Sequence, residues 1–476
     1  MKKTKRIISF TMAVLFFALP ALASQPKYVF YFIGDGLGAS QRQFSEFFVR
    51  EKNHNPAQQL LMNRFEVAGL NTTYAADTLI TDSAAAGTAL ASGVKTNKGV
   101  IGKDPSGKDV KTLIEAAEDR GIATGIITTT RLTHATPAAF ASHNISRNNE
   151  NEIAEDFLTS NVDFFAGGGI RHFIPKGMVE KNADAVGKTI KSKRKDDKNL
   201  VKGFEKKGYK TFIGMKGARD FNTTEFSGLD KVFAAFTYTH MPYEIERTSI
   251  YKEVPSLSRM TRAAIDVLSK DPEGFFLMVE GGRIDHAAHA NDPTGVIHDT
   301  IAFDRALEEA YDFYQKHREE TLIVVVGDHE TGGMGLGMDS MGYKLDMSCL
   351  MDTKVSVEDT LAYGKGQYKG DKEAYLAFLR ENFGLSDLNE TEKSGLAKAM
   401  ASADAGETAG YYKVNPAALT AAHILSNRAN INWTTTIHTA TMIPMSATGK
   451  GAERFSGYKD NTQIAQAMAG LLDFNL

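Results

Sequence analysis

Cysteine is almost absent from this chain. Cys349 is the only one among 476 residues, so no intrachain disulfide can form. A chain of this length buries enough apolar surface to fold without covalent cross-links. Cys349 lies in a stretch with methionines on either side, and we expect an ordinary buried side chain there rather than a reactive thiol.

Long apolar runs are also missing once residues 1–23 are set aside, which argues against a transmembrane helix in the rest of the chain. The N-terminus carries four lysines and arginines, then the mostly apolar stretch Ile7–Leu19, which is too short to span a bilayer, and then the A-x-A sequence Ala21–Ala23. This order is typical of a secretory signal peptide. We therefore expect cleavage after Ala23 and a periplasmic or secreted mature chain of residues 24–476 with no membrane anchor. An uncleaved anchor is the alternative.

An excess of basic charge is absent as well. Removing the four basic residues of the expected signal peptide leaves 51 of the 55 lysines and arginines against 58 aspartates and glutamates, a net charge of about −7 with neutral histidines. The lysine-rich stretch Lys188–Lys207 is interleaved with acidic residues, and we expect a solvated helix face there. Without a basic stripe, nucleic acid is not expected as a partner.

Short apolar runs alternate with helical patterns, which is typical of an α/β fold with a mainly parallel central sheet flanked by helices. The expected strands are Lys27–Ile33, Ala123–Thr128, Val162–Phe165, Phe275–Val279 and Leu322–Val326, and the expected helices include Val110–Arg120, Ser258–Ser269 and Thr294–His317. Residues 335–430, approximately, begin with a glycine- and methionine-rich stretch and then show several helical patterns. We expect a large insertion there, with an ordinary second half of the fold as the alternative.

Metal-ligating residues follow three of these strands. Asp35 follows the first strand, Glu280 follows Val279, and Asp328 and His329 follow the strand that ends at Val326. Ligands bind outside the carboxyl ends of strands in open α/β sheets, so we expect a site at this edge. The turn around Asp35 lacks the G-x-G-x-x-G spacing of a dinucleotide loop, and its carboxylate would repel pyrophosphate, so a metal ligand fits it better.

Ser83 lies beside Asp82 in TDSAAAGTA (81–89), where a loop is expected to turn into a helix of small residues. Free backbone N–H groups and the positive end of the helix dipole suit a phosphate-sized anion at such a position. No Ser-His-Asp spacing surrounds Ser83. A serine hydroxyl close to metal ligands indicates metal-activated phosphoryl transfer.

Asp285 and His289 are four positions apart, so a helical turn would place both on one face where they can hold one ion. With a distant third ligand such as His438 they would form a zinc site that keeps a position open for substrate. Asp328 and His329 form a second pair of ligands. Arg147 is the candidate side chain for holding phosphate oxygens. The other histidines are expected to be ordinary core or surface residues: His54, His143, His172, His240, His298, His317 and His423.

Six segments together resemble the alkaline phosphatase family in the family's order, over essentially the whole mature chain. They are IGDGLG (33–38), TDSAAAGTALASG (81–93), THATPAAFASHNISR (133–147), VEGGRIDHAAHAND (279–292), VVGDHETGG (325–333) and the segment around His438. The resemblance implies a phosphomonoesterase in which Ser83 is the nucleophile that forms a phosphoserine, Arg147 holds two phosphate oxygens and Asp82 orients Arg147. It also implies a homodimer, with the insertion forming a crown near the dimer interface.

The resemblance further implies two Zn²⁺ and one Mg²⁺. The implied ligands are Asp285, His289 and His438 for the first zinc, Asp35, Asp328 and His329 for the second, with Ser83 held there as an alkoxide, and Asp35, Glu280 and Thr136 for magnesium. Two positions that vary within the family are both histidine here, His134 and His286. His134 cannot orient magnesium-bound waters as a carboxylate can, which leaves the identity of the third ion open between magnesium, zinc and others. Neutral His286 predicts weaker phosphate retention than a lysine would give.

The alternative functions are a phosphodiesterase or phosphonate hydrolase on the same two-metal scaffold and a non-catalytic metal- or phosphate-binding protein. Diesterases of that kind typically lack the arginine and the third metal site, and a non-catalytic relative would lack a ligand or the nucleophile. Here Arg147, Thr136, Glu280 and Ser83 are all present. A sulfatase would need the sequence C/S-x-P-x-R, which is absent at Ser83. The sequence thus favours a phosphomonoesterase acting on small phosphate monoesters.

Overall fold

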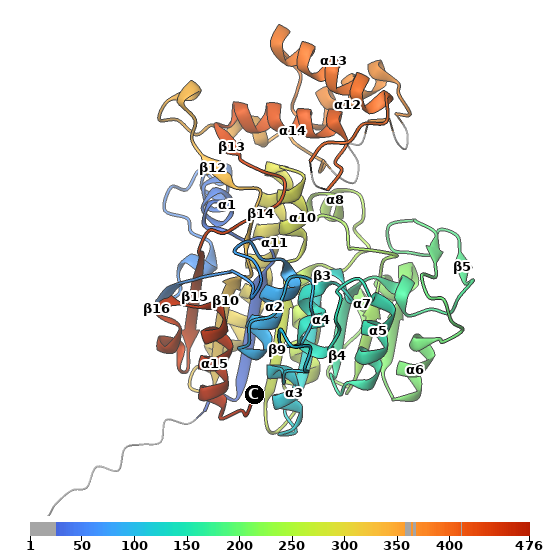
Figure 1. The fold of residues 1–476 in the computed structure, drawn as a ribbon, viewed down its shortest axis with the longest axis vertical. Coiled ribbons are helices and arrows are strands. Elements are labelled where there is room, and N and C mark those ends of the chain that lie inside the picture. Colours follow the sequence, from blue (N-terminus) through green and yellow to red (C-terminus); the bar gives the residue numbers. More distant parts are fainter. Residues whose placement is uncertain (1–24, 358–362, 365–367, 411) are drawn as a thin grey trace, which may run out of the picture.

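A ten-stranded mixed sheet forms the centre of the protein, in the order β16-β2-β15-β10-β1-β9-β3-β4-β8-β7 (Figure 1). The computed structural model describes residues 25–476 except 358–362, 365–367 and 411. The predicted signal peptide lies outside the described residues. Within the described part of the chain, no helix is both long and apolar enough to cross a membrane.

The middle of the sheet is parallel and almost completely buried. Its strands are β10 (Thr321–Gly327), β1 (Tyr28–Gly34), β9 (Phe275–Glu280), β3 (Ala123–Arg131) and β4 (Phe164–Gly168). Their near-continuous apolar sequences reflect burial on both faces, as expected for a parallel sheet covered by helices. The predicted α/β class and the predicted strands are confirmed, with strand ends that differ by a few residues.

Five further strands complete the sheet on its two sides. On one side lie β8 (Val232–Ala235) and β7 (Lys210–Ile213), and on the other lie β15 (Ile443–Gly449), β2 (Val67–Asn71) and β16 (Gly457–Lys459). β15 is antiparallel to both β10 and β2. β15 therefore begins at the carboxyl edge of the parallel strands, directly after the segment that contains His438.

Alternate residues of β1 define two cores, one on each face of the sheet. Val29, Tyr31 and Ile33 pack against one set of helices, and Tyr28, Phe30 and Phe32 against the other. The first set includes α2 (Ser83–Ser92), α3 (Leu113–Glu118), α4 (Ala135–Ala141), α5 (Glu150–Thr159) and α15 (Asn461–Leu472); the second includes α7 (Gly214–Thr223), α9 (Leu257–Leu268) and α11 (Pro293–Lys316). This alternation is the two-residue period of a strand buried on both faces.

A third core lies above the carboxyl edge of the sheet, in the segment of residues 334–433, which we call the cap segment (Figure 1). It contains β12 (Met334–Leu336), α12 (Lys372–Asn382), α13 (Glu390–Asp404), α14 (Pro416–Arg428) and β13 (Ile431–Trp433). Its apolar side chains pack on α1 (Ala39–Lys52) through Phe44 and Phe48. At its base β12 pairs with β13, and immediately below them β11 (Glu330–Thr331) pairs with β14 (His438–Thr439).

Two predicted helices are shorter than expected. The helix expected over Val110–Arg120 is α3, which begins only after Thr112, because a reciprocal capping box between Thr112 and Glu115 fixes its start. The solvated helix expected over Lys188–Lys207 is wrong for most of that stretch, where only α6 (Leu200–Lys206) is helical. The stretch contains Arg194, whose buried guanidinium bonds Glu155 and Asp196, and this arrangement favours a compact loop over a continuous helix.

Candidate active site

The carboxyl edge of the parallel strands carries a buried group of acidic and histidine side chains. Asp35 follows β1, Glu280 ends β9, and Asp328 and His329 follow β10, while the pairing of β14 with β11 places His438 opposite Thr331. All of these residues are at most 6% exposed. The topology thus brings together ligands that the sequence analysis expected at this edge, together with one that is far away in the chain.

Ser83 is the first residue of α2, and Asp82 caps that helix. The Asp82 carboxylate accepts hydrogen bonds from the backbone N–H groups of Ala85 (3.1 Å) and Gly99 (3.0 Å) and from Arg147 Nη1 (3.0 Å). Burial raises the pKa of Asp82, but Arg147 and the two backbone donors outweigh it and hold this pKa below its ordinary value. Asp82 is therefore an anion that fixes Arg147 beside the serine hydroxyl.

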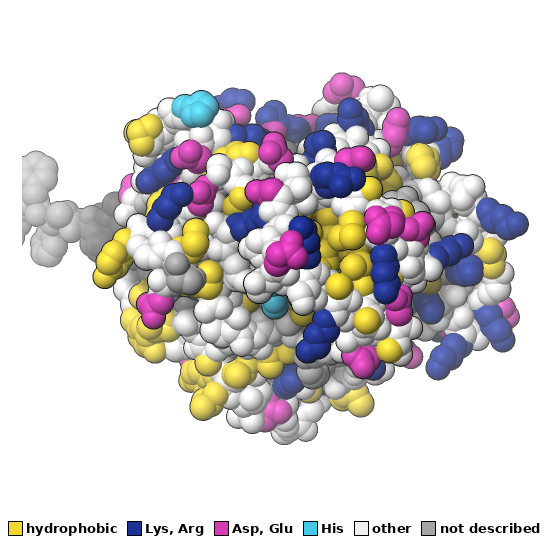
Figure 2. Space-filling view, turned by 90° about the horizontal axis from the view of Figure 1, so that it is seen from above, with side chains coloured by type: hydrophobic (Ala, Val, Ile, Leu, Met, Phe, Trp, Pro, Cys, Tyr) yellow, Lys and Arg dark blue, Asp and Glu magenta, His cyan; other side chains and the backbone are white. Residues whose placement is uncertain are grey.

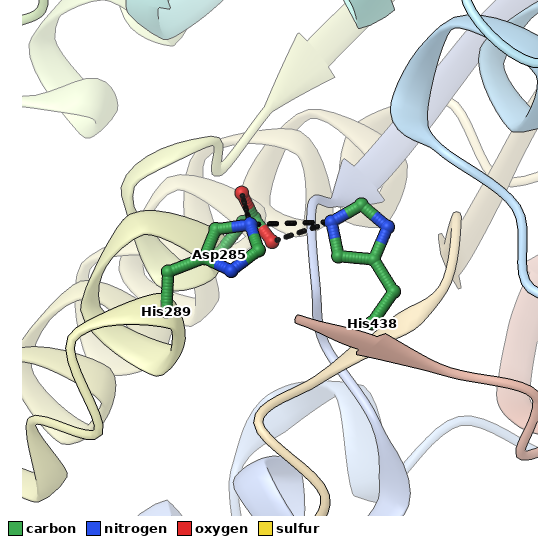
Figure 3. Close-up of side chains that lie close together, drawn as sticks. All are labelled: Asp285, His289 and His438. Atoms are coloured by element: carbon green, nitrogen blue, oxygen red, sulfur yellow. Dashed lines mark hydrogen bonds and ion pairs between the residues drawn. The ribbon is translucent and has the colours of Figure 1, made fainter. Parts of the chain in front are cut away.

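A first group of ligands comprises Asp285 and His289 on α10 (Arg283–His289) and His438 on β14 (Figure 3). His289 Nε2 lies 3.2 Å from both Asp285 Oδ2 and His438 Nε2. His289 Nδ1 donates to the Thr436 carbonyl (2.7 Å) and His438 Nδ1 to the Thr81 carbonyl (2.8 Å). These bonds assign the proton of each neutral ring to Nδ1, so two Nε2 lone pairs face one another. A cation between them would relieve that repulsion.

A second group surrounds Ser83. His329 Nε2 lies 3.2 Å from Ser83 Oγ, 3.3 Å from Asp328 Oδ2 and 3.4 Å from Asp35 Oδ1, and Ser83 Oγ is 3.5 Å from Asp35 Oδ1. Asp285 also approaches this group closely enough to link it to the first. Asp328 Oδ1 accepts two backbone hydrogen bonds, whereas its Oδ2 is buried without a hydrogen-bond partner and faces His329 Nε2, as an atom that shares a cation with that ring would.

A third group lies on the other side of Asp35. Its members are four buried polar atoms without hydrogen-bond partners, namely Asp35 Oδ2, His134 Nδ1, Thr136 Oγ1 and Glu280 Oε1. Glu280 Oε2, in contrast, accepts hydrogen bonds from Thr128 and Thr130. Orphaned polar atoms are costly in a protein interior, and the three oxygens of this set together fit a bound cation.

The electrostatics of the three groups support the same conclusion. Burial and the neighbouring carboxylates raise the pKa values of Asp35 and Asp328, and burial raises the pKa of Glu280 to about 7. Burial lowers the pKa of His438 to about 4 and that of His329 well below its ordinary value, which keeps both rings neutral. Neutral imidazoles beside crowded, buried carboxylates are the form in which these side chains bind metal ions.

The two histidines at the variable positions lie at the edge of the site. Arg147 Nη2 lies 3.1 Å from His134 Nε2, and Arg283 Nη1 lies 2.8 Å from His286 Nδ1. An arginine can only donate, so each of these nitrogens is an acceptor. The proton of neutral His134 is then on Nδ1 and that of neutral His286 on Nε2.

His240 belongs to the same cluster, although the sequence analysis treated it as an ordinary histidine. Its ring centroid lies 4.3 Å from that of His286 and 5.5 Å from that of His134, and its ring contacts Arg131. His240 has no ligand partner at helical spacing and does not follow a predicted strand. No local signal in the sequence could have revealed its position.

Tyr412 is a second residue that the sequence analysis missed. It comes from the cap segment, and its ring centroid lies 3.6 Å from that of His289 with an interplanar angle of 39°. Trp433 lies below it in the fold, where it packs against Gly332 and donates from its indole N–H to Ser426 Oγ (3.0 Å). Trp433 thus supports the base of the cap segment, whereas Tyr412 reaches a member of the first group.

Ser83 begins a helix beside an anchored arginine and next to three adjoining groups of metal-capable side chains. This combination defines a metal-dependent enzyme of phosphoryl transfer. The chain belongs to the alkaline phosphatase family, whose sequence model matches residues 26–474. It is a phosphomonoesterase.

Similar proteins agree over most of the chain. Alkaline phosphatase 3 of Bacillus subtilis (strain 168) is 32% identical over 460 residues, which cover 94% of this chain and 90% of the relative. Thermus thermophilus alkaline phosphatase superposes with a TM-score of 0.79 at 30% identity, covering 96% of this chain and 93% of the other. A cold-active alkaline phosphatase from a psychrophilic Shewanella species gives a TM-score of 0.77 at 29% identity, covering 94% and 99%.

Proposed function

We propose that this phosphomonoesterase is exported and that its reaction passes through a phosphoserine at Ser83, with Zn²⁺ in the first and second groups and Mg²⁺ in the third. The observation that carries the proposal is the position of Ser83 Oγ, 3.2 Å from His329 Nε2 in the second group and directly beside the Arg147–Asp82 pair. This one hydroxyl adjoins both a metal-ligand group and an anion-binding side chain.

Different side chains have different roles in the proposed in-line displacement at phosphorus. Ser83 Oγ attacks phosphorus from the side of the second group, and Arg147, held by Asp82, binds two non-bridging oxygens. The leaving oxygen departs opposite Ser83, toward Asp285, His289 and His438. Two bound zinc ions would supply the charge that lowers the pKa of the attacking hydroxyl and neutralises the leaving oxygen. A water then attacks from the vacated side, and Ser83 is the leaving group.

The donor atoms support zinc in the first two groups. Two imidazoles and a carboxylate in the first group match a tetrahedral zinc site with one open position. In the second group Asp35, Asp328 and His329 approach the same space as Ser83 Oγ, so the hydroxyl can complete the coordination sphere. Substrate phosphate would bind between the first and second groups.

Magnesium fits the third group because its available donors are oxygens of Asp35, Thr136 and Glu280. His134 does not change this assignment, because the proton on Nδ1 makes that nitrogen a donor to a coordinated water or to Asp35. Direct zinc ligation through Nδ1 would put a proton on Nε2, facing the Arg147 guanidinium 3.1 Å away. We therefore assign Mg²⁺ here, with occupancy that depends on the Arg147–His134 contact.

Export and dimerisation complete the proposal. The N-terminal sequence pattern supports a signal peptide, and the family expectation supports a homodimer. Leu70 on β2 and Tyr458 on the neighbouring edge strand β16 are register partners, and both side chains are exposed, so they form an apolar patch at this edge of the sheet. Such a patch is typical of a protein–protein contact. The face seen from above instead carries interspersed acidic and basic side chains, which gives no support to nucleic-acid binding (Figure 2).

The test is trapping of the phosphoenzyme with Ser83→Ala. Wild-type enzyme quenched in acid during turnover of a radiolabelled monoester should retain label on protein, and Ser83→Ala should retain none and lose at least about a thousandfold in kcat. Ser92→Ala, at the far end of the same helix, is the matched control and should behave as wild type. Undiminished turnover by Ser83→Ala would remove the proposed nucleophile. A diester rate equal to the monoester rate would instead favour the phosphodiesterase alternative.

A further inference from the structure

Tyr412 is held by a small turn of the cap segment that is anchored at its base. Ala409 and Val414 exchange two backbone hydrogen bonds, both 2.8 Å long, and so close this turn. Gly410 has φ of +68°, and a Cβ there would lie 2.5 Å from Thr436 Oγ1. The turn therefore rests directly on Thr436 and leaves no room for a side chain at Gly410.

Thr436 connects this turn to the first ligand group. Its carbonyl accepts the Nδ1–H of His289, the bond that directs the Nε2 lone pair of His289 toward Asp285 and His438. Tyr412 contacts the same imidazole through its ring. The Thr436 carbonyl and the Tyr412 ring thus both contact His289. These two contacts fix the position of the phenol relative to the first group.

The Tyr412 side chain is accessible although it contacts a buried residue. Tyr412 is 49% exposed although it contacts a ligand that is only 4% exposed. Tyr412 thus presents an exposed ring directly beside the first group, toward which the leaving oxygen is proposed to depart.

This position has a consequence for the alcohol part of the substrate. If the leaving oxygen departs toward His289, the atoms attached to that oxygen approach the Tyr412 ring, which lies against His289 and is half exposed. Aromatic rings at such distances attract one another by offset or edge contacts, beyond the area they bury. A small alkyl group would leave most of the phenol in water.

We propose that Tyr412 is a specificity-determining residue that contacts the leaving group and favours phosphate monoesters in which an aromatic ring is bonded directly to the ester oxygen. This rests on the proposed function, because it uses the direction of departure assigned there. The substrate class is therefore aryl phosphates, preferred over alkyl phosphates of similar size.

Competitive inhibition by two phosphonates separates binding from chemistry. Phenylphosphonate and methylphosphonate place a ring or a methyl group where the ester oxygen of a substrate would be, and inorganic phosphate has neither. We expect Tyr412→Ala to lower the ratio of the methylphosphonate Ki to the phenylphosphonate Ki by roughly 3- to 10-fold, the range given by one aromatic pair. Tyr412→Phe should retain the wild-type ratio. Tyr343→Ala, a fully exposed tyrosine of the same cap segment, is the matched control and should not change it.

The remaining outcomes are distinct. A ratio unchanged in Tyr412→Ala, with normal metal content and with phosphate still binding, overturns the inference and leaves the proposed function intact. Equal weakening of both phosphonates together with lost zinc also overturns it, because Tyr412 would then only support His289. If the wild-type enzyme binds neither phosphonate nor phosphate, the proposed function itself fails.

Discussion

His286→Lys tests whether the neutrality of one imidazole governs phosphate release. His286 Nδ1 accepts from Arg283 (2.8 Å), so the neutral ring presents Nε2–H as a donor. Burial and the nearby Arg283 both lower the pKa of His286, which keeps the ring uncharged throughout neutral and alkaline assays. The proposed contact of this residue with product phosphate is therefore a hydrogen bond without a charge in the wild type.

A lysine at this position adds a charge to that contact. A charge-assisted hydrogen bond is about twice as strong as a neutral one, a difference of about 1 kcal/mol. We therefore expect the competitive Ki for inorganic phosphate at pH 8 to fall about fivefold, with a steeper dependence on salt. If product release limits turnover, kcat should fall in parallel.

His286→Gln is the matched control, because its amide keeps a neutral donor and an acceptor for Arg283. Its Ki should stay within about twofold of wild type. A lysine variant with full metal content whose Ki is unchanged or weaker would refute the reasoning. The neutral form of His286 would then not be what limits phosphate affinity.

Two further predictions concern stability. Chelation should abolish activity and lower Tm together, because buried carboxylates at the ends of β1, β9 and β10 would then face one another without cations. Calorimetry with and without added zinc checks this prediction. An unchanged Tm in the metal-free protein would contradict it. His143, four residues before Arg147 in the sequence, forms hydrogen bonds with Glu115 Oε1 (2.7 Å) and the Gly102 carbonyl (2.6 Å). Burial would lower its pKa, but these bonds raise it to about 9, above its ordinary 6.5. The stability that the charged pair contributes is therefore fully present below pH 6.5, declines as the pH rises and is lost above pH 9. In urea unfolding, His143→Gln should cost about 1 kcal/mol at pH 6 and close to nothing at pH 10; an equal cost at both values would refute the assignment.

Much of the fold and of the ligand set follows from local sequence patterns. The buried strands are continuous apolar runs, and the acidic residues that follow them lie at one edge because parallel strands share a direction. Asp285 and His289 could be paired from their spacing alone. For His438 the sequence supplied only a candidate, since its arrival depends on the long-range pairing of β14 with β11.

Other features could not be read from local patterns. His240 joins His134 and His286 only because the loop after β8 returns over the end of β3, a tertiary contact without a periodic signature. Tyr412 reaches His289 from the cap segment by the same kind of contact. Lys188–Lys207 looked like a solvated helix because its charges alternate, whereas the buried Arg194 gives most of it a different conformation.

The two strand pairs at the base of the cap segment hold the active-site residues in place independently of the outer part of that segment. β11 with β14 fixes His438 against Thr331, and β12 with β13 closes the segment immediately beyond. Residues further out can change in length or composition while both strand pairs keep their register. Selectivity for the alcohol could therefore be re-engineered in the loops that approach the metal groups, with the reacting atoms left in place.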